Sequence, residues 1–334
     1  MRIGVIGAGA IGGAVASLLD RVGHLVEVTA RGEHLAAIRA DGLRLDGGWG
    51  EHTARVEAAE TLQSTPELVF LCTKAQDART AIEENAHVLR GVTVVVVQNG
   101  LAGLREAAGL LPDSDCVGAL ALYASSYLSP GRITVTTTAN TYLGAGDGAP
   151  PEAAVEAARI LDVAMPAFAV ENFTGCQWTK LIVNQVNAMP AITGLSVQQT
   201  LADRRLRAIV TASMQEATRI GLDHGIRYGS IQGLDHRILR FVAAAPRWAA
   251  QVVPLLMKRR MGATPNPGST LQSIRRGQRS EIDYLNGAVV AEAAAIGRGA
   301  PINAELTALV HEVEERGGFL APEAVAERLR PLTA

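Results

Sequence analysis

The 334-residue sequence is poor in cysteine, in aromatic residues and in net charge. Its three cysteines, Cys72, Cys116 and Cys176, are far apart and form no C-x-x-C pair, which argues against a disulfide framework or a zinc site. Aromatic residues make up only 4 %, and 31 basic side chains nearly balance 33 acidic ones, so neither a base-stacking surface nor a basic field for nucleic acid is expected. No apolar run approaches the roughly 20 residues of a membrane span, and no leader-like segment precedes the first strand pattern. These absences favour a globular, cytoplasmic protein with no metal, nucleic-acid or membrane partner.

Lysine is almost absent as well. Of the 31 basic residues, 28 are arginine and only three are lysine, namely Lys74, Lys180 and Lys258. Lysine differs from arginine chiefly in having a pKa that burial can lower and a proton that it can donate. Composition alone explains any one of the three equally well as a chance survivor, so their sequence context has to decide.

Two domains are predicted, because the chain is about twice the usual domain length of ~150 residues. The first half alternates strand and helix patterns, and from about residue 175 apolar residues recur at helical spacing. We therefore predict an α/β Rossmann-type domain over residues 1–170 and an all-α domain over residues 171–334. Strands are expected at 2–6, 25–29, 68–73, 93–97, 117–123, 133–138 and 141–144, the last two as an antiparallel pair, with helices at 11–19, 34–39 and 76–89.

A glycine-rich turn, Gly7-Ala8-Gly9-Ala10-Ile11-Gly12, joins the first predicted strand to the first helix. In a G-x-G-x-x-G motif the glycines permit a tight turn, close approach of the backbone to a pyrophosphate and close packing of helix on strand. The helix N-terminus then presents unpaired N–H groups to the phosphates. The motif is weak by itself, but its position within a βαβ unit predicts a dinucleotide-binding site.

The end of the second predicted strand bears on the choice of dinucleotide. NAD sites place an acidic residue about 20 residues after the glycines, where it binds the ribose 2′-hydroxyl. Here the strand is followed by Arg31, whose guanidinium can pair with the 2′-phosphate of NADP, whereas Glu27 lies mid-strand and points elsewhere. NADP is therefore favoured, against the alternative that Arg31 is a solvated surface residue beside Glu27 and Glu33.

Polar residues also follow two later strands. Cys72-Thr73-Lys74 ends one buried strand, and Gln98-Asn99-Gly100 ends the next. Open α/β sheets bind ligands outside the carboxyl ends of their strands, so Lys74 and Asn99 are expected to face that crevice, where a cation suits an anionic substrate. The alternative is an ordinary loop lysine and a turn-forming Asn-Gly pair.

The helical half carries a second set of polar candidates. Lys180 and Asn184 are four residues apart and therefore share one face of a helix whose other positions are largely apolar. Ser269 and Glu281 lie at the edges of later helical patterns. Each of these residues also has a structural explanation. Lys180 and Asn184 could lie on a solvated surface, and Glu281 could be an N-terminal charge of a helix or could form a surface ion pair with Arg279.

In combination these residues resemble the ketopantoate reductase (2-dehydropantoate 2-reductase) family. The resemblance covers nearly the whole chain, and its motifs occur in order: the glycine turn, Arg31, Lys74, Asn99-Gly100, Trp178-Thr179-Lys180-x-x-x-Asn184, Ser269 and Glu281-Ile282-Asp283. It implies an NADPH-binding Rossmann domain followed by a helical domain for substrate binding and dimerisation, and hence a homodimer. It also implies reduction of a 2-oxo acid to a 2-hydroxy acid, ketopantoate to pantoate, on the route to coenzyme A.

The resemblance implies a role for each candidate residue. Lys180 would be the general acid, and Glu281 would hold the hydroxyl group of the substrate. This is chemically consistent, because hydride transfer to a ketone leaves negative charge on oxygen, which an ammonium group stabilises and protonates. The substrate would be positioned by Lys74, Asn99, Asn184 and Ser269. The cofactor would be held by the six residues of the glycine turn and by Arg31, Lys74 and Asn99.

One position departs from the family pattern. The family commonly carries a second asparagine eight residues after the lysine, usually followed by proline, whereas this chain has Ala188 there, with Asn187 and Pro190 nearby. A shift of one residue turns a helical side chain by ~100°, so Asn187 is not expected to reach the same substrate group. The identity of the oxo acid is therefore open.

Three further functions stay open on the sequence. A family member that reduces a different oxo acid in secondary metabolism would keep the same chemistry. An NADP-binding sensor without turnover would keep the fold, although the presence of Lys180 and Glu281 argues against it. Nucleic-acid binding would use a basic cluster that is better explained as a solvated rim of a near-neutral chain. That cluster consists of Lys258, Arg259, Arg260, Arg275, Arg276 and Arg279.

Overall fold

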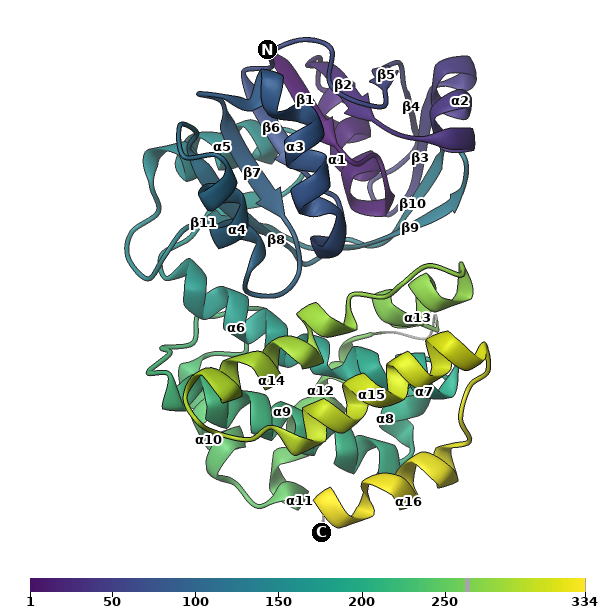
Figure 1. The fold of residues 1–334 in the computed structure, drawn as a ribbon, viewed down its shortest axis with the longest axis vertical. Coiled ribbons are helices and arrows are strands. Elements are labelled where there is room, and N and C mark those ends of the chain that lie inside the picture. The colour runs from purple at the N-terminus through teal and green to yellow at the C-terminus, as the bar shows by residue number, and fades with distance from the viewer. Residues whose placement is uncertain (262–264, 334) are drawn as a thin grey trace. The chain divides into compact units, whose positions relative to one another are not determined.

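The computed structural model describes residues 1–261 and 265–333. The chain divides into two compact units, Met1–Phe173 and Thr174–Ala334, against an expected boundary after residue 170. The first unit is built on two β-sheets and the second is helical (Figure 1). The predicted fold class, an α/β Rossmann-type domain followed by an all-α domain, is confirmed. Over the described ranges, no helix has the length and apolar character needed to cross a membrane.

An eight-stranded sheet is the framework of the first unit. Its strand order is β12-β11-β8-β7-β6-β1-β2-β5. The six strands from β8 to β5 run parallel, whereas β11 is antiparallel to β8 and parallel to β12. The strand order reverses between β1 and β6, which is the point where open α/β sheets bind ligands. The strands are β1 (Arg2–Ile6), β2 (Leu25–Thr29), β5 (Glu57–Ala59), β6 (Leu68–Leu71), β7 (Thr93–Val97), β8 (Cys116–Ala121), β11 (Thr141–Gly144) and β12 (Ala167–Ala169).

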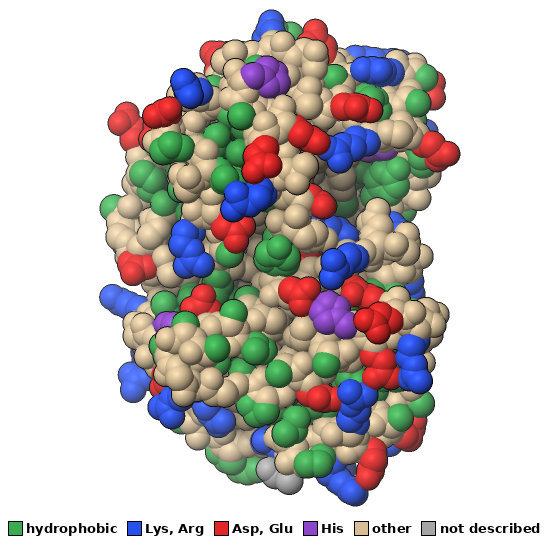
Figure 2. Space-filling view, viewed as in Figure 1, with side chains coloured by type: hydrophobic (Ala, Val, Ile, Leu, Met, Phe, Trp, Pro, Cys, Tyr) green, Lys and Arg blue, Asp and Glu red, His purple; other side chains and the backbone are tan. Residues whose placement is uncertain are grey.

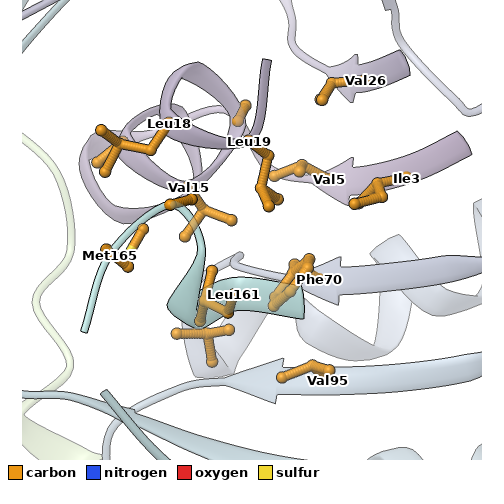
Figure 3. Packing of buried hydrophobic residues seen from close by; sticks show 14 of the residues in the cluster. Ile3, Val5, Val15, Leu18, Leu19, Val26, Phe70, Val95, Leu161 and Met165 are labelled. Carbon is orange, nitrogen blue, oxygen red and sulfur yellow. The ribbon is translucent and has the colours of Figure 1, made fainter. Parts of the chain in front are cut away.

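Helices cover both faces of this sheet because its central strands are apolar on both sides. All four residues of β6 are buried. One face is covered by α1 (Ala10–Arg21), α2 (Gly32–Asp41) and α5 (Glu152–Asp162), and the other by α3 (Ala78–Leu89) and α4 (Gly103–Leu110). Figure 3 shows side chains of α1, together with Leu161 of α5, gathered against Phe70 and Val95 of the central strands. A short 3-10 helix, η1 (Ala75–Asp77), precedes α3.

A four-stranded sheet packs against α1 as well. Its order is β4-β3-β10-β9, with β3 (Leu43–Gly47), β4 (His52–Ala54), β9 (Ala124–Ser129) and β10 (Arg132–Thr137). Helix α1 contacts strands of both sheets. Gly13 makes this close approach possible, since a Cβ there would lie 2.8 Å from Cγ1 of Ile133 in β10. The helix that follows the glycine turn is therefore held by two sheets.

The predicted antiparallel pairing of residues 133–138 with 141–144 is wrong. β10 pairs with β9 and β3 in the four-stranded sheet, whereas β11 pairs with β8 and β12 in the larger sheet. A local alternation of apolar residues shows that a segment is a strand, but its partners are chosen by tertiary packing. For the same reason the patterns missed the short elements β3, β4, β5, β9 and β12, and also the helices α4 and α5.

The second unit is organised around the 20-residue helix α9. Helices α8, α10, α11, α12, α14, α15 and α16 pack against it, and it also contacts η2, the turn that follows α6. Asp203 caps the N-terminus of α9 by accepting hydrogen bonds from two backbone N–H groups. The elements are α6 (Phe173–Asn184), η2 (Gln185–Asn187), α7 (Ala188–Thr193), α8 (Val197–Ala202), α9 (Arg204–Asp223), α10 (His236–Ala244), α11 (Arg247–Ala250), α12 (Val252–Arg260), α13 (Gly268–Arg275), η3 (Ile282–Tyr284), α14 (Asn286–Ala295), α15 (Pro301–Arg316) and α16 (Pro322–Thr333).

Charged side chains of the two signs are mixed on one face of the molecule. On the face shown in Figure 2, acidic and basic side chains are interspersed. In the basic cluster that the sequence indicates, all five arginines are exposed. Three of them are bound to backbone carbonyl groups, Arg260 to Gln232 at 2.5 Å, Arg275 to Gly194 at 3.1 Å and Arg276 to Gln272 at 3.1 Å. These contacts are those of solvated surface residues.

Candidate active site

The glycine motif forms the turn between β1 and α1. Gly7 has a φ of +93°, a left-handed conformation that glycine adopts readily. A Cβ on Gly12 would lie 2.1 Å from the carbonyl oxygen of Gly7, so this glycine lets the helix pack directly on the turn. A Cβ on Gly9, in contrast, would meet nothing within 4 Å. The turn is therefore tightly packed at Gly12 and open at Gly9, as a cradle for a pyrophosphate requires.

The N-terminus of α1 is suited to bind an anion. Gly9 caps the helix without any side-chain hydrogen bond, which leaves the first-turn N–H groups available to a phosphate. Thr29 holds the turn from β2, because its side-chain oxygen accepts from the Gly7 N–H and its carbonyl accepts from the Ala8 N–H, both at 2.9 Å. The observed backbone thus fits a dinucleotide at the residues that the motif predicts.

His34 supports the same turn and was not singled out from the sequence. Its Nδ1 accepts a hydrogen bond from the Gly131 N–H at 2.9 Å, so the ring proton lies on Nε2, which donates to the Ala8 carbonyl at 2.7 Å. Burial lowers the pKa of His34, although the bond to Ala8 opposes this. The neutral ring therefore links the glycine turn to the loop between β9 and β10.

Arg31 lies at the start of α2, where its side chain is exposed. Its Nη2 forms an ion pair with Oε2 of Glu84 on α3 at 2.5 Å. Glu27, the acidic residue of β2, is buried and accepts hydrogen bonds from the backbone N–H of Gln63 and from the Ser64 hydroxyl. The carboxylate of Glu27 is therefore engaged with this loop, and Arg31 is the charged group that follows the strand.

Lys74 and Asn99 lie on neighbouring loops at the carboxyl ends of β6 and β7, and both are half-buried. The side-chain N–H of Gln98 donates to the Thr73 carbonyl at 3.1 Å and joins the two loops. Thr73 also borders the glycine turn, since a Cβ on Gly7 would lie 3.0 Å from its Cγ2. The structure thus brings the glycine turn, Lys74 and Asn99 to one edge of the sheet, at the switch point between β1 and β6.

Two polar atoms at this edge are buried and, among the described residues, have no hydrogen-bond partner. They are Oγ1 of Thr73 and Oε1 of Gln98. Oε1 of Gln98 faces the start of α4, because a Cβ on Gly103 would lie 2.2 Å from it, so of the two residues only Thr73 borders the glycine turn.

Lys180 and Asn184 lie on α6 in the helical unit, one turn apart. The neighbouring side chains Trp178, Leu181 and Ile182 are buried, whereas Lys180 is half-buried. Burial lowers the pKa of Lys180 from its ordinary 10.5 to about 8, while the carboxylate of Glu281 acts to raise it. Lys180 and Glu281, from distant parts of the sequence, are therefore electrostatically coupled.

Asn187 lies on the same side of the helix axis as Lys180, because it is seven residues, close to two full helical turns, further along the chain. Counting ~100° per residue in α6 and ~120° in η2, Asn187 falls within about 40° of Lys180 and Ala188 about 140° away. In agreement, Ala188 is 0 % exposed and packed in the core. Asn187 and position 188 nevertheless differ in direction by about 100°, so it stays a prediction that Asn187 does not reach the substrate group bound by the family asparagine.

Ser269 is exposed in the first turn of α13, next to Asn187. The preceding residue, Gly268, has a φ of +74°, and a Cβ on it would lie 2.7 Å from Oδ1 of Asn187. The Asn187 carboxamide therefore lies directly against the residue before Ser269. Within the helical unit, two groups of candidates are brought together: Lys180 with Asn184 and Glu281, and Asn187 with Ser269.

Comparison with known proteins extends over both units. The family model "Ketopantoate reductase PanE/ApbA" matches residues 3–148, and its C-terminal counterpart matches residues 172–314. The chain is 27 % identical over 320 residues to a 2-dehydropantoate 2-reductase from Pyrococcus horikoshii, covering 95 % of this chain and 99 % of the relative. It is 29 % identical over 346 residues to one from Mesorhizobium japonicum, covering 96 % and 100 %.

Solved structures show the same architecture. A PanE/ApbA family ketopantoate reductase from Ralstonia eutropha has a TM-score of 0.81 at 27 % identity, covering 95 % of this chain and 99 % of that one. D-mandelate dehydrogenase, solved with NADH and anilino(oxo)acetate, has a TM-score of 0.80 with the same coverage. At 20 % identity this second likeness shows a shared fold alone.

The protonation of Lys180 can be measured directly, because the chain has only three lysines. In protein labelled at lysine Cε, we expect one NMR signal, absent from Lys180→Arg, to titrate with a pKa of about 8. In Glu281→Gln this pKa should fall further, since the carboxylate that stabilises the ammonium is gone. An unshifted lysine pKa in the parent protein, or no response to Glu281→Gln, would contradict the coupling.

Proposed function

The chain belongs to the ketopantoate reductase family, and we propose that it uses NADPH to reduce a 2-oxo acid, 2-dehydropantoate, to the 2-hydroxy acid pantoate. Members named for this reaction are oxidoreductases that act on CH–OH groups, and they match this chain over nearly its whole length. The observation that carries the proposal is the half-buried Lys180 beside Glu281. A cytoplasmic location is part of the proposal and agrees with the three free cysteines.

In this proposal Lys180 supplies the proton of the reaction. When bound, the reduced nicotinamide supplies a hydride to the ketone carbon. The Lys180 ammonium stabilises the negative charge that develops on the ketone oxygen and transfers a proton from Nζ to it, which completes the alcohol. The neutral amine then regains a proton from solvent. A pKa of about 8 suits this role, because the amine is mostly protonated at neutral pH and is still acidic enough to donate.

The other polar residues bind and orient the acid. Glu281 accepts a hydrogen bond from the substrate hydroxyl and keeps Lys180 protonated. Asn184, one helical turn from Lys180, and Ser269 provide hydrogen-bonding groups for the rest of the molecule. On the N-terminal unit, Lys74 and Asn99 border the glycine turn, where they contact both the nicotinamide end of the cofactor and the anionic substrate.

NADPH is favoured over NADH by the groups that follow β2. Arg31 offers a guanidinium there, while the acidic alternative, Glu27, is already bound by the loop at residues 63–64. The ion pair with Glu84 keeps Arg31 in place but also competes with a ligand for the guanidinium. A 2′-phosphate therefore has to share or displace that carboxylate, which makes Glu84 a modulator of affinity.

A different oxo acid is the second candidate, and one observation favours it. The position of the second family asparagine is the buried Ala188, and the carboxamide comes instead from Asn187, 8 % exposed and packed against Gly268. An amide displaced along the helix would bind a substrate with a differently placed polar group. The fold does not decide between acids, because D-mandelate dehydrogenase shares it.

The proposal is tested by following NADPH oxidation with a panel of 2-oxo acids, among which 2-dehydropantoate should react fastest. Lys180→Ala should bind NADPH normally, judged by nicotinamide fluorescence, but lose at least ~100-fold in kcat for want of the general acid. Lys258→Ala is the matched lysine control and should keep full activity. Turnover with another acid alone would reject the substrate, and no turnover with any acid would favour a cofactor-binding sensor.

The cofactor assignment is tested separately. Arg31→Ala should weaken NADPH binding about 10- to 100-fold and leave NADH binding nearly unchanged, because only NADPH carries the 2′-phosphate. Glu84→Gln should bind NADPH at least as tightly as the parent, since the competing carboxylate is removed. Titration calorimetry of both dinucleotides measures this. Equal losses for NADPH and NADH in Arg31→Ala would exclude Arg31 from the 2′-phosphate site.

We also propose a homodimer formed through helices α10, α11 and α12. All three pack on α9, and their inner side chains form a small apolar cluster. Their outer apolar side chains are exposed, with Trp248 at 78 %. Large apolar groups exposed together on neighbouring helices are typical of a protein interface. The exposed set is Ile238, Phe241, Trp248, Val252, Leu255 and Leu256.

Light scattering after gel filtration tests the homodimer. The parent protein should elute with twice the mass of one chain, and Trp248→Asp should shift it to the mass of a monomer, because the charge would be buried without a partner. Val163→Asp replaces another exposed apolar residue, on the first unit, and should leave the mass unchanged. A parent protein that is monomeric at micromolar concentration would overturn the assignment.

A further inference from the structure

Two side chains of α15 bind the backbone segment that carries Glu281. Oε1 of Glu314 accepts a hydrogen bond from the backbone N–H of Ser280 at 2.8 Å, one residue before Glu281. Nε2 of His311 lies 2.8 Å from Oδ1 of Asp283, two residues after Glu281. His311 and Glu314 are three residues apart on one helix and therefore face the same way. Helix α15 thus binds the segment on both sides of Glu281.

His311 joins the two anchors into one unit. Its second ring nitrogen, Nδ1, lies 3.0 Å from Oε2 of Glu314, so both ring nitrogens face carboxylate oxygens. Carboxylates only accept hydrogen bonds, so both nitrogens donate and the ring is an imidazolium. Burial acts to lower the pKa of His311, but the hydrogen bonds and charges of Asp283 and Glu314 outweigh burial and raise it. Charge-assisted bonds of this kind are stronger than neutral ones.

The Glu281 segment needs such anchors because it is not held by a regular helix. Glu281 precedes the three-residue turn η3 and makes no side-chain cap to it. Its carbonyl accepts from the Tyr284 N–H at 3.0 Å, which stabilises the turn but does not attach it to another element. Ser280 and Ile282, on either side, are buried, so the backbone is already close to the core. Bonds from α15 therefore hold the segment on both sides of Glu281.

We propose that His311 and Glu314 are positioning residues that hold Glu281 beside Lys180. They touch neither substrate nor cofactor in this scheme and act through Glu281 alone. The inference deepens the proposed function and rests on it for the role of Glu281. Misplacement of a reacting group by about 1 Å can cost ~100-fold in rate, so a loosened anchor has a measurable effect.

A surface ion pair without function is the alternative, and the geometry argues against it. The Glu314 side chain is largely buried, and its two oxygens serve different partners, the Ser280 backbone and the His311 ring. Glu312, two residues earlier on the same helix, is an ordinary ion-pair residue, since its two oxygens bind Arg316 and Arg328. Glu312 is therefore a matched control.

The first experiment measures steady-state kinetics with 2-dehydropantoate. Glu314→Ala should raise KM for the acid and lower kcat/KM by about 10- to 100-fold, with unchanged affinity for NADPH. Glu314→Gln keeps an oxygen that can accept from Ser280 and should recover most of the loss. Glu312→Gln should match the parent. The proposal would be overturned if folded Glu314→Ala protein has the KM of the parent, or if its affinity for NADPH falls by the same factor as its kcat/KM.

The second experiment does not depend on turnover and separates the two proposals. If Glu281 drifts from Lys180 in Glu314→Ala or His311→Gln, the NMR pKa of Lys180 should fall in the same direction as in Glu281→Gln. The Ser280 amide should also exchange faster with solvent. If no oxo acid is reduced but the Lys180 pKa does shift in these variants, the proposed reaction is rejected and the positioning role is kept. An unchanged Lys180 pKa and unchanged exchange in folded variants would reject the positioning role.

Discussion

The chemistry proposed for this protein depends on a balance at Lys180 between burial and the carboxylate of Glu281. Burial removes water from the ammonium group and favours the neutral amine, while the carboxylate restores part of the lost stabilisation. Burial alone would lower the pKa of the amine further, and an exposed lysine would hold its proton too tightly for a general acid near neutral pH. The rest of the helical unit can be understood as the scaffold that maintains this balance.

That scaffold combines one regular helix with one irregular segment. Lys180 is placed by α6, whereas Glu281 sits between helices and is placed by contacts from α15. A buried polar network fixes the region just beyond, because the Asn286 side chain donates to Asn303 at 2.9 Å and the Asn303 backbone N–H donates to Glu216 at 2.8 Å. These bonds join helices α9, α14 and α15. Because hydrogen bonds are directional, they specify one relative arrangement of the three helices.

In the N-terminal unit the main structural requirement is a different one, namely close approach of the backbone to a phosphate group. Gly12 and Gly13 let α1 approach the glycine turn on one side and β10 on the other. Thr29 and His34 then hold the turn through hydrogen bonds to its backbone. A rigid turn with an open position at Gly9 binds an anion without first having to be ordered, which saves conformational entropy on binding.

The sequence by itself determined the features that depend on local geometry. The glycine turn, the parallel core strands and the pairing of Lys180 with Asn184 on one helix face follow from spacing, because helices and strands have fixed periods. Only the tertiary structure decided which groups meet across long separations, such as Arg31 with Glu84, and which strands share a sheet, since β10 and β11 lie in different ones. The hydrogen bonds from α15 to the Glu281 segment were likewise decided by the tertiary structure. Such contacts depend on packing between helices and strands, and the periodic pattern of one helix or strand does not specify which other element it packs against.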